Sequence, residues 1–174
     1  MDNWQETSQQ SHTETIPPAV THSLENIKPT SSELNYLWIT YMAESMSIAM
    51  LKHMVAKSKD PLFHGVLAFA LAASSQNIIA LESVFERIQH PIPGGFGERD
   101  VDISAPELFA EEFSMRYTKL MQKYIVINHS TAFSDCSRWD MKNMFSEFID
   151  RAKQVINKLD EALLTRGLFA KSPY

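Results

Sequence analysis

The sequence contains a single cysteine, Cys136, and only five glycines among its 174 residues. One cysteine excludes an internal disulfide and fits a reducing compartment. The chain opens with a polar, acidic stretch, MDNWQETSQQSHTETIPP, and so lacks the basic-then-apolar pattern of a secretory signal. We therefore expect a soluble, cytoplasmic protein that needs no disulfide to hold its core.

An excess of basic residues is also missing. The net charge is −5; residues 1–33 hold five acids and one base (−4), and the other 141 residues hold 16 acids and 15 bases (−1). Nothing here resembles a nucleic-acid footprint, so we expect no nucleic-acid partner. The longest weakly charged run, 37–54, carries Glu44 at its middle, where a membrane span of about 20 apolar residues would not tolerate a carboxylate. We expect a buried helix there and no membrane span.

Helix signals fill the chain from residue 30 onward. The stretch 30-TSSE-33 is a capping box with Thr30 as N-cap, and Asp60 followed by Pro61 is typical of a second helix start. Ser104 is a candidate cap for a third helix, and Gly167 is a candidate C-cap for a fourth. Residues 1–29, rich in Ser, Thr, Gln and Pro, predict a disordered acidic tail, and 30–174 predict one bundle domain. The expected helices are about 31–56, 61–89, 105–133 and 138–166.

The link between the second and third expected helices is long. Residues 90–105 can stretch to about 50 Å at 3.3 Å per residue. The second helix, at 29 residues, is about 44 Å long at 1.5 Å per residue. The link is therefore long enough to return along the whole bundle, which makes helices 2 and 3 parallel. This predicts an all-α, ferritin-like four-helix bundle with one long crossover.

Three separated segments carry a family resemblance. They are 37-LWITYMAESMS-47, the crossover pieces 91-PIPGGF-96 and 100-DVDISAPELF-109, and the tail 166-RGLFAKSPY-174. Together they resemble an uncharacterised ferritin-like domain family of spore-forming bacteria, described as spore-coat-like and usually present as two tandem copies. The resemblance implies the bundle fold and a link to sporulation. It implies no catalytic residues, because the family has no established reaction.

A ferritin-like fold suggests a di-iron centre, and the sequence does not provide one. Such a centre needs Glu-x-x-His on two of the four helices, and no Asp or Glu in this chain is followed three residues later by His. We therefore predict no enzyme activity and no cofactor. His53 and His64 flank the turn that joins the first and second expected helices, with Asp60 between them. They are weak candidates for a divalent metal site.

Glu44 is the one charged residue on the core-facing side of the first helix. At the same height the predicted faces of helices 2 and 3 offer Gln76, Tyr117 and Tyr124, which predicts a mid-bundle polar cluster. Such a cluster is a small-ligand pocket, a remnant of a metal site, or a structural network with a raised carboxyl pKa; the further alternative is that Glu44 lies at the edge of the core, in contact with solvent. The predicted core face of helix 2 is Leu62, Val66, Phe69, Ala73, Gln76 and Ala80. The predicted core face of helix 3 is Phe113, Tyr117, Leu120, Tyr124 and Ile127. The predicted core face of helix 4 is Met141, Phe145, Phe148, Ala152, Val155 and Leu159.

The first helix is apolar around much of its circumference, with Trp38, Met42, Ala49 and Met54 off its core-facing side. A helix of this kind is buried on more than one side, and we expect a homodimer with an isologous interface. The leading interpretation is a non-enzymatic structural or protein-interaction module, spore-associated by resemblance. The alternative is a small-ligand or metal-binding bundle using the cluster around Glu44.

Overall fold

The computed structural model describes residues 27–168, and this part of the chain forms four long α-helices and no β-strand. The helices are α1 (Ser31–Lys57), α2 (Pro61–Arg87), α3 (Glu111–Asp135) and α4 (Trp139–Thr165), with a short 3₁₀ helix, η2 (Glu98–Asp100), in the link between α2 and α3. The predicted all-α four-helix bundle is confirmed. Most of the predicted disordered tail, residues 1–26, lies outside the described residues.

The helix ends follow the predicted caps closely. Thr30 and Glu33 form the capping box of α1, and the Asp60 side chain accepts the Leu62 N–H at the start of α2. Gly167 has a φ of +68°, the left-handed conformation in which glycine is favoured after a helix. The predicted caps therefore mark three of the helix boundaries, two through side-chain hydrogen bonds and one through the backbone conformation of Gly167.

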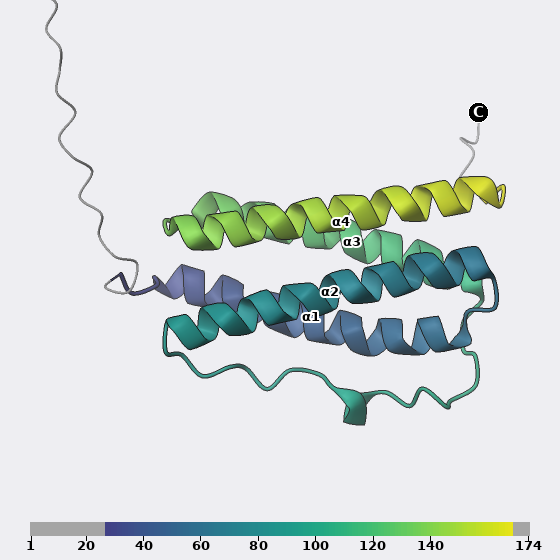
Figure 1. The fold of residues 1–174 in the computed structure, drawn as a ribbon, viewed down its shortest axis with the longest axis horizontal. Helices are drawn as coiled ribbons and strands as arrows, with labels where there is room; N and C mark the ends of the chain where they lie inside the picture. Colours follow the sequence, from purple (N-terminus) through teal and green to yellow (C-terminus); the bar gives the residue numbers. More distant parts are fainter. Residues whose placement is uncertain (1–26, 169–174) are drawn as a thin grey trace, which may run out of the picture.

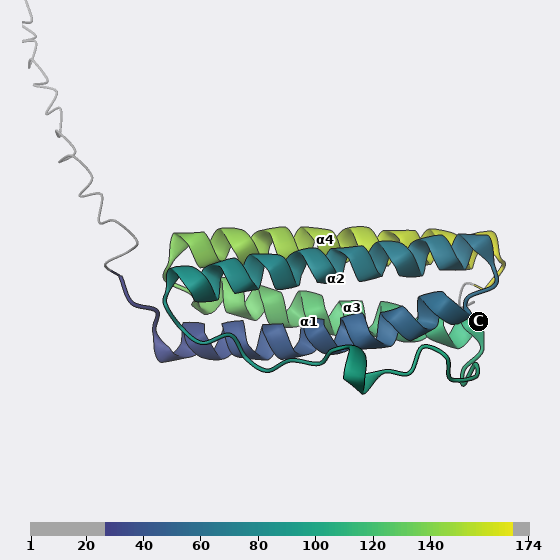
Figure 2. The same ribbon diagram turned by 60° about the horizontal axis from the view of Figure 1, so that its bottom comes forward.

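The long link crosses the bundle as predicted. Helices α1 and α2 are antiparallel, as are α3 and α4, and the link returns along the outside so that α3 runs parallel to α2 (Figure 1). The turned view shows the link lying beside α1 (Figure 2). The Phe96 N–H donates to the Ser45 hydroxyl of α1 at 3.1 Å, and Lys52 pairs with Glu98 at 3.3 Å. The predicted role of this segment as a strap is confirmed by these contacts.

The third helix begins later than predicted, at Glu111 instead of residue 105. Ser104 does not cap it, because the Ser104 backbone and hydroxyl both donate to Asp102 within the link. The start of α3 is instead tied to the α1–α2 turn, where the Glu111 carboxylate accepts from the Ser58 hydroxyl at 2.8 Å and the Asp60 N–H at 3.0 Å.

The buried apolar side chains form two clusters, one toward each end of the bundle. One contains Phe63, Leu67, Met115 and Leu159; the other contains Leu37, Phe85, Phe145 and Phe148. Length and composition alone would allow α2 to cross a membrane, but here its apolar residues supply both clusters. Between the clusters lies a layer of buried polar side chains.

Candidate functional site

The polar layer takes a side chain from each helix: Glu44 on α1, Asn77 on α2, His129 on α3 and Arg151 on α4. The Asn77 amide donates to Glu44 Oε1 at 2.9 Å, and Arg151 donates to Asn77 Oδ1 at 2.9 Å. Glu44 and His129 have side chains only 1% and 3% exposed, and His129 Nε2 lies 3.8 Å from Glu44 Oε1. The layer therefore joins all four helices through a chain of polar contacts, in which Glu44, Asn77 and His129 are buried and the Arg151 side chain is 27% exposed.

Burial shifts the pKa of both titratable groups toward the neutral form. Burial raises the pKa of Glu44 to about 7, against the opposing effects of the Asn77 hydrogen bond, the nearby Ser74 hydroxyl and the Arg151 charge. Burial lowers the pKa of His129 to about 4. Near neutral pH the imidazole is thus uncharged, while the carboxyl group is close to its midpoint of titration.

Two polar atoms of this layer lack a hydrogen-bond partner among the described residues: Glu44 Oε2 and His129 Nδ1. An unpaired buried polar atom costs about 1–3 kcal/mol. Among the described residues, the polar atoms of the layer are therefore only partly satisfied.

The predicted partner of Glu44 on α2 is wrong by one residue. Gln76 is exposed, and its neighbour Asn77 is 4% exposed and holds the carboxylate. One residue rotates a helix face by 100°, because an α-helix has 3.6 residues per turn. The residues that α2 buries also recur at intervals of three and four, so the sequence contained a second stripe with helical spacing besides the predicted one. This buried stripe is Phe63, Val66, Ala70, Ser74, Asn77, Leu81 and Val84.

The predicted tyrosines do not reach the layer either. Tyr124 is 54% exposed, and the Tyr117 hydroxyl lies 3.5 Å from the Met50 sulfur. His129, which does face Glu44, was missed because the sequence offered a more apolar stripe elsewhere on α3. The predicted core face of α3 is therefore wrong, whereas every residue of the predicted α4 face is buried.

The two weak metal candidates lie in different surroundings. His64 is exposed on α2, whereas His53 is partly buried against the link. Within residues 27–168 no three His, Cys, Asp or Glu side chains are grouped so as to hold a metal ion. His53 instead lines a hollow of about 280 Å³ between α1 and the link, together with Asp100 and Asp102.

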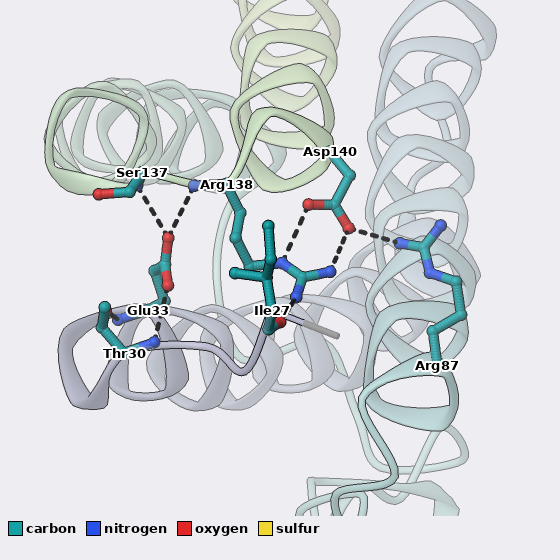
Figure 3. A network of polar contacts seen from close by, with 7 residues as sticks. All are labelled: Ile27, Thr30, Glu33, Arg87, Ser137, Arg138 and Asp140. Carbon is teal, nitrogen blue, oxygen red and sulfur yellow. Dashed lines mark hydrogen bonds and ion pairs between the residues drawn. The ribbon is translucent and has the colours of Figure 1, made fainter. Parts of the chain in front are cut away.

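A second polar network closes the end of the bundle where α1 and α4 begin (Figure 3). Glu33 Oε1 accepts the backbone N–H groups of Ser137 and Arg138 at 2.8 and 2.9 Å, while its other oxygen completes the α1 capping box. Burial alone would raise the pKa of Glu33, but hydrogen bonds from the Thr30, Arg138 and Ser137 backbones outweigh it and lower the pKa. This buried carboxylate therefore joins the starts of two helices.

Arg138 extends the same network. Its guanidinium binds both carboxylate oxygens of Asp140, at 3.1 and 3.0 Å, and also donates to the Ile27 carbonyl oxygen. Asp140 in turn lies 3.5 Å from Arg87 at the end of α2. Together with Glu33, these contacts connect the starts of α1 and α4, the end of α2 and the first described residue, Ile27. The network therefore stabilises this end of the bundle.

The most apolar stripe of α3 faces outward. Its buried side carries Ser114, Thr118, Gln122 and His129, while its exposed side is aromatic and aliphatic. On the neighbouring α1, further large apolar side chains are exposed. We call this surface the α1/α3 face. Its seven members, each 45–58% exposed, are Ile39 and Met46 on α1, Phe109 at the end of the link, and Phe113, Leu120, Tyr124 and Ile127 on α3.

The fold and its interior define the class: an all-α four-helix bundle with one long crossover and a buried polar layer. The chain belongs to DUF3231, a family of proteins of unknown function, whose model matches residues 21–174. No curated protein matches the chain significantly.

Two solved structures are similar in fold. One, from Bacillus halodurans C-125, is provisionally named a spore coat protein; it has a TM-score of 0.78 at 14% identity, over 86% of this chain and 97% of that one. The other is a DUF305 fragment from Deinococcus radiodurans, with a TM-score of 0.66 at 11% identity, over 80% of this chain and 99% of that one. At these identities the likeness is one of fold.

Proposed function

We propose that this protein is a non-enzymatic structural or protein-interaction module associated with the bacterial spore. The observation that carries the proposal is the α1/α3 face, where α3 turns its more apolar side toward solvent. A large exposed apolar surface is typical of a protein-binding site. The spore association and an intracellular location come from the likeness to the Bacillus halodurans protein and from the single cysteine.

The interior of the bundle supports a scaffold over an enzyme. Glu44 and His129 are the titratable pair best placed for proton transfer, and both are buried below 4% exposure. A substrate would have to displace packed side chains such as Phe145 and Phe148 to reach them. The hollow of about 280 Å³ beside His53 lies between α1 and the link, and Glu44 is not among its lining residues.

A second function is supported by a different observation. Within residues 27–168, Glu44 Oε2 and His129 Nδ1 are buried without hydrogen-bond partners, and a small ligand or a metal ion in the polar layer would satisfy such atoms. In that case the bundle is a ligand-binding protein, with Glu44 and His129 as the contacting groups.

Metal content separates the two functions. Tag-free protein would be analysed by inductively coupled plasma mass spectrometry, with Glu44→Ala as the matched variant. The scaffold proposal expects no stoichiometric iron, manganese or zinc in either protein. Stoichiometric metal that is lost in Glu44→Ala would overturn it in favour of the ligand-binding function.

The spore association has its own test. The chain would be expressed during sporulation of a spore-forming host, and coat extract and cytosol would be compared by immunoblotting. We expect the wild-type chain in the spore fraction and its loss from that fraction when Leu120 and Ile127 of the α1/α3 face are changed to Lys. Equal recovery of wild type and variant in the cytosol alone would contradict the proposal.

A further inference from the structure

The α1/α3 face is continuous across its two helices. The Tyr117 hydroxyl of α3 contacts the Met50 sulfur of α1 at 3.5 Å, and the Thr118 hydroxyl lies 3.8 Å from the Met54 sulfur. A shallow groove of about 60 Å³ runs between the two helices, lined by side chains of both. Exposed Met46 lines this groove beside Met121, so the apolar side chains of α1 and α3 belong to one surface.

The area of this surface matches what a stable dimer needs. A fully exposed large side chain presents roughly 200 Å², so seven that are each about half exposed present about 700 Å². The largest apolar patch on a typical monomer is about 300–600 Å². A standard protein–protein interface buries about 800 Å² on each partner.

Within the sequence given, residues 1–26 and 169–174 offer little apolar length to cover the face. The six residues that follow Leu168 reach at most about 20 Å at 3.4 Å per residue, about half the length of α3. The 26 residues that precede Ile27 include only five large apolar side chains, Met1, Trp4, Ile16, Val20 and Leu24. That segment leaves the described chain at Ile27, whose carbonyl oxygen is held by Arg138 at one end of the bundle.

The face is compatible with a copy of itself. None of its seven side chains is charged, so facing its own copy brings no like charges together at the centre. The cations of α3 lie beside it, and two already have partners: Arg116 pairs with Glu112 at 2.7 Å, and Lys119 pairs with Asp160. Aromatic residues and methionine, which are enriched at interfaces, make up four of the seven.

We propose that the α1/α3 face packs against the same face of a second copy of this chain, forming a closed isologous dimer. The proposal rests on the proposed function, because it names the partner of the interaction module. An isologous contact uses the same surface on both chains, so assembly stops at two. The dimer would cover the aromatic stripe of α3 with the partner's α1/α3 face.

The test is the molar mass of the full chain by light scattering and sedimentation equilibrium. We expect twice the chain mass of 19.8 kDa, with no larger species. Ile127→Lys would raise the dissociation constant at least 10-fold, because it places a charge in the apolar interface. Tyr124→Lys is a second variant on the same face.

The control is Ile79→Lys on α2. Ile79 is 66% exposed and Ile127 is 58% exposed, so the two substitutions are matched in type and in exposure. Ile79→Lys should leave the mass at two chains. Circular dichroism of all variants shows whether each still folds, so a change of mass in a folded variant reports the interface.

Three results would overturn the dimer: a wild-type chain at monomer mass up to hundreds of micromolar, a mass ladder beyond two chains, or equal loss of dimer in Ile79→Lys and Ile127→Lys. A monomeric chain whose face variants still lose their place in the spore fraction would overturn the dimer and leave the interaction module standing. A monomer whose face variants keep that place would overturn both.

Discussion

The Glu33 carboxylate of α1 accepts the backbone N–H of Arg138 at 2.9 Å, across 105 residues of sequence. The same side chain closes the capping box at Thr30, so a single carboxylate serves the starts of both α1 and α4. Two helices that are distant in the chain are thereby held at a defined height relative to each other.

Replacing Glu33 should destabilise the bundle. In Glu33→Ala the N–H groups of Ser137 and Arg138 lose their acceptor, and each buried unpaired donor costs about 1–3 kcal/mol. Urea unfolding followed by circular dichroism measures the change in the free energy of unfolding. Glu161→Ala is the control, because Glu161 is exposed on α4; an equal loss in both variants would contradict the assigned role.

Glu33 should also make stability depend on acidity. Its pKa is lowered in the folded protein, so its contribution is present above the unfolded value of 4.5 and is lost as the pH falls through the folded pKa. Wild type should therefore lose more stability than Glu33→Gln between pH 5 and pH 3, in urea unfolding at each pH. An identical pH profile in the two proteins would argue against a charged Glu33.

The polar layer predicts two opposite pH dependences. The pKa of Glu44 is raised from 4.5 to about 7, so its contribution is fully present below 4.5 and is lost as the pH rises toward 7. The pKa of His129 is lowered from 6.5 to about 4, so its contribution is present above 6.5 and is lost as the pH falls toward 4. In wild type the two trends oppose each other between about pH 4.5 and 6.5.

Single variants should separate these trends. In Glu44→Gln only His129 of the pair still titrates, so the stability of this variant should fall on acidification from pH 6.5 to pH 4. In His129→Asn only Glu44 still titrates, so the stability of this variant should fall as the pH rises from 4.5 to 7. The change is about 3 kcal/mol at most in each case, from 1.36 kcal/mol per pKa unit. Chemical denaturation across this range measures it, and parallel curves for both variants would refute the pKa assignment.

We expect the link between α2 and α3 to be destabilised by an alanine substitution at Gly95 and to tolerate one at Gly94. A Cβ added at Gly95 would lie 2.7 Å from Ser45 Oγ and 2.8 Å from Tyr41 Cε1, whereas one added at Gly94 would meet nothing within 4 Å. Gly95→Ala should cost about 1–3 kcal/mol, as overpacking does, and should speed proteolysis of the link. Gly94→Ala is the matched control, and equal behaviour of the two would mean that the link is not packed on α1 as described.

Cys136 should be unreactive in the folded protein. Its side chain is buried, and burial, together with the nearby charge of Glu33, raises the pKa of the thiol to about 11. Labelling with a thiol reagent at pH 8 should be slow in buffer and rapid in denaturant. Fast labelling of the folded chain would show that this end of the bundle opens readily.

The sequence by itself determined the starts of α1 and α2, the connectivity and one core face, but not the start of α3. Capping residues such as Thr30 and Asp60 act on their own backbone, so their effect is readable locally. The length of the link between α2 and α3 decided the order of the helices in space. The apolar face of α4 was unambiguous, because Met141 through Leu159 form a single apolar stripe opposite a charged side.

Only the tertiary structure decided which sides of α2 and α3 face inward. Each of these helices carries more than one stripe with helical spacing, and a rotation of 100° exchanges Gln76 for Asn77. The sequence predicted that Tyr124 lies inside and did not predict His129 there, since the apolar stripe of α3 is stronger than its polar one. The partners of Glu44 follow from packing among four helices, which no local pattern encodes. The exposed α1/α3 face is a consequence of the same packing, and we propose that a second copy of the chain covers it.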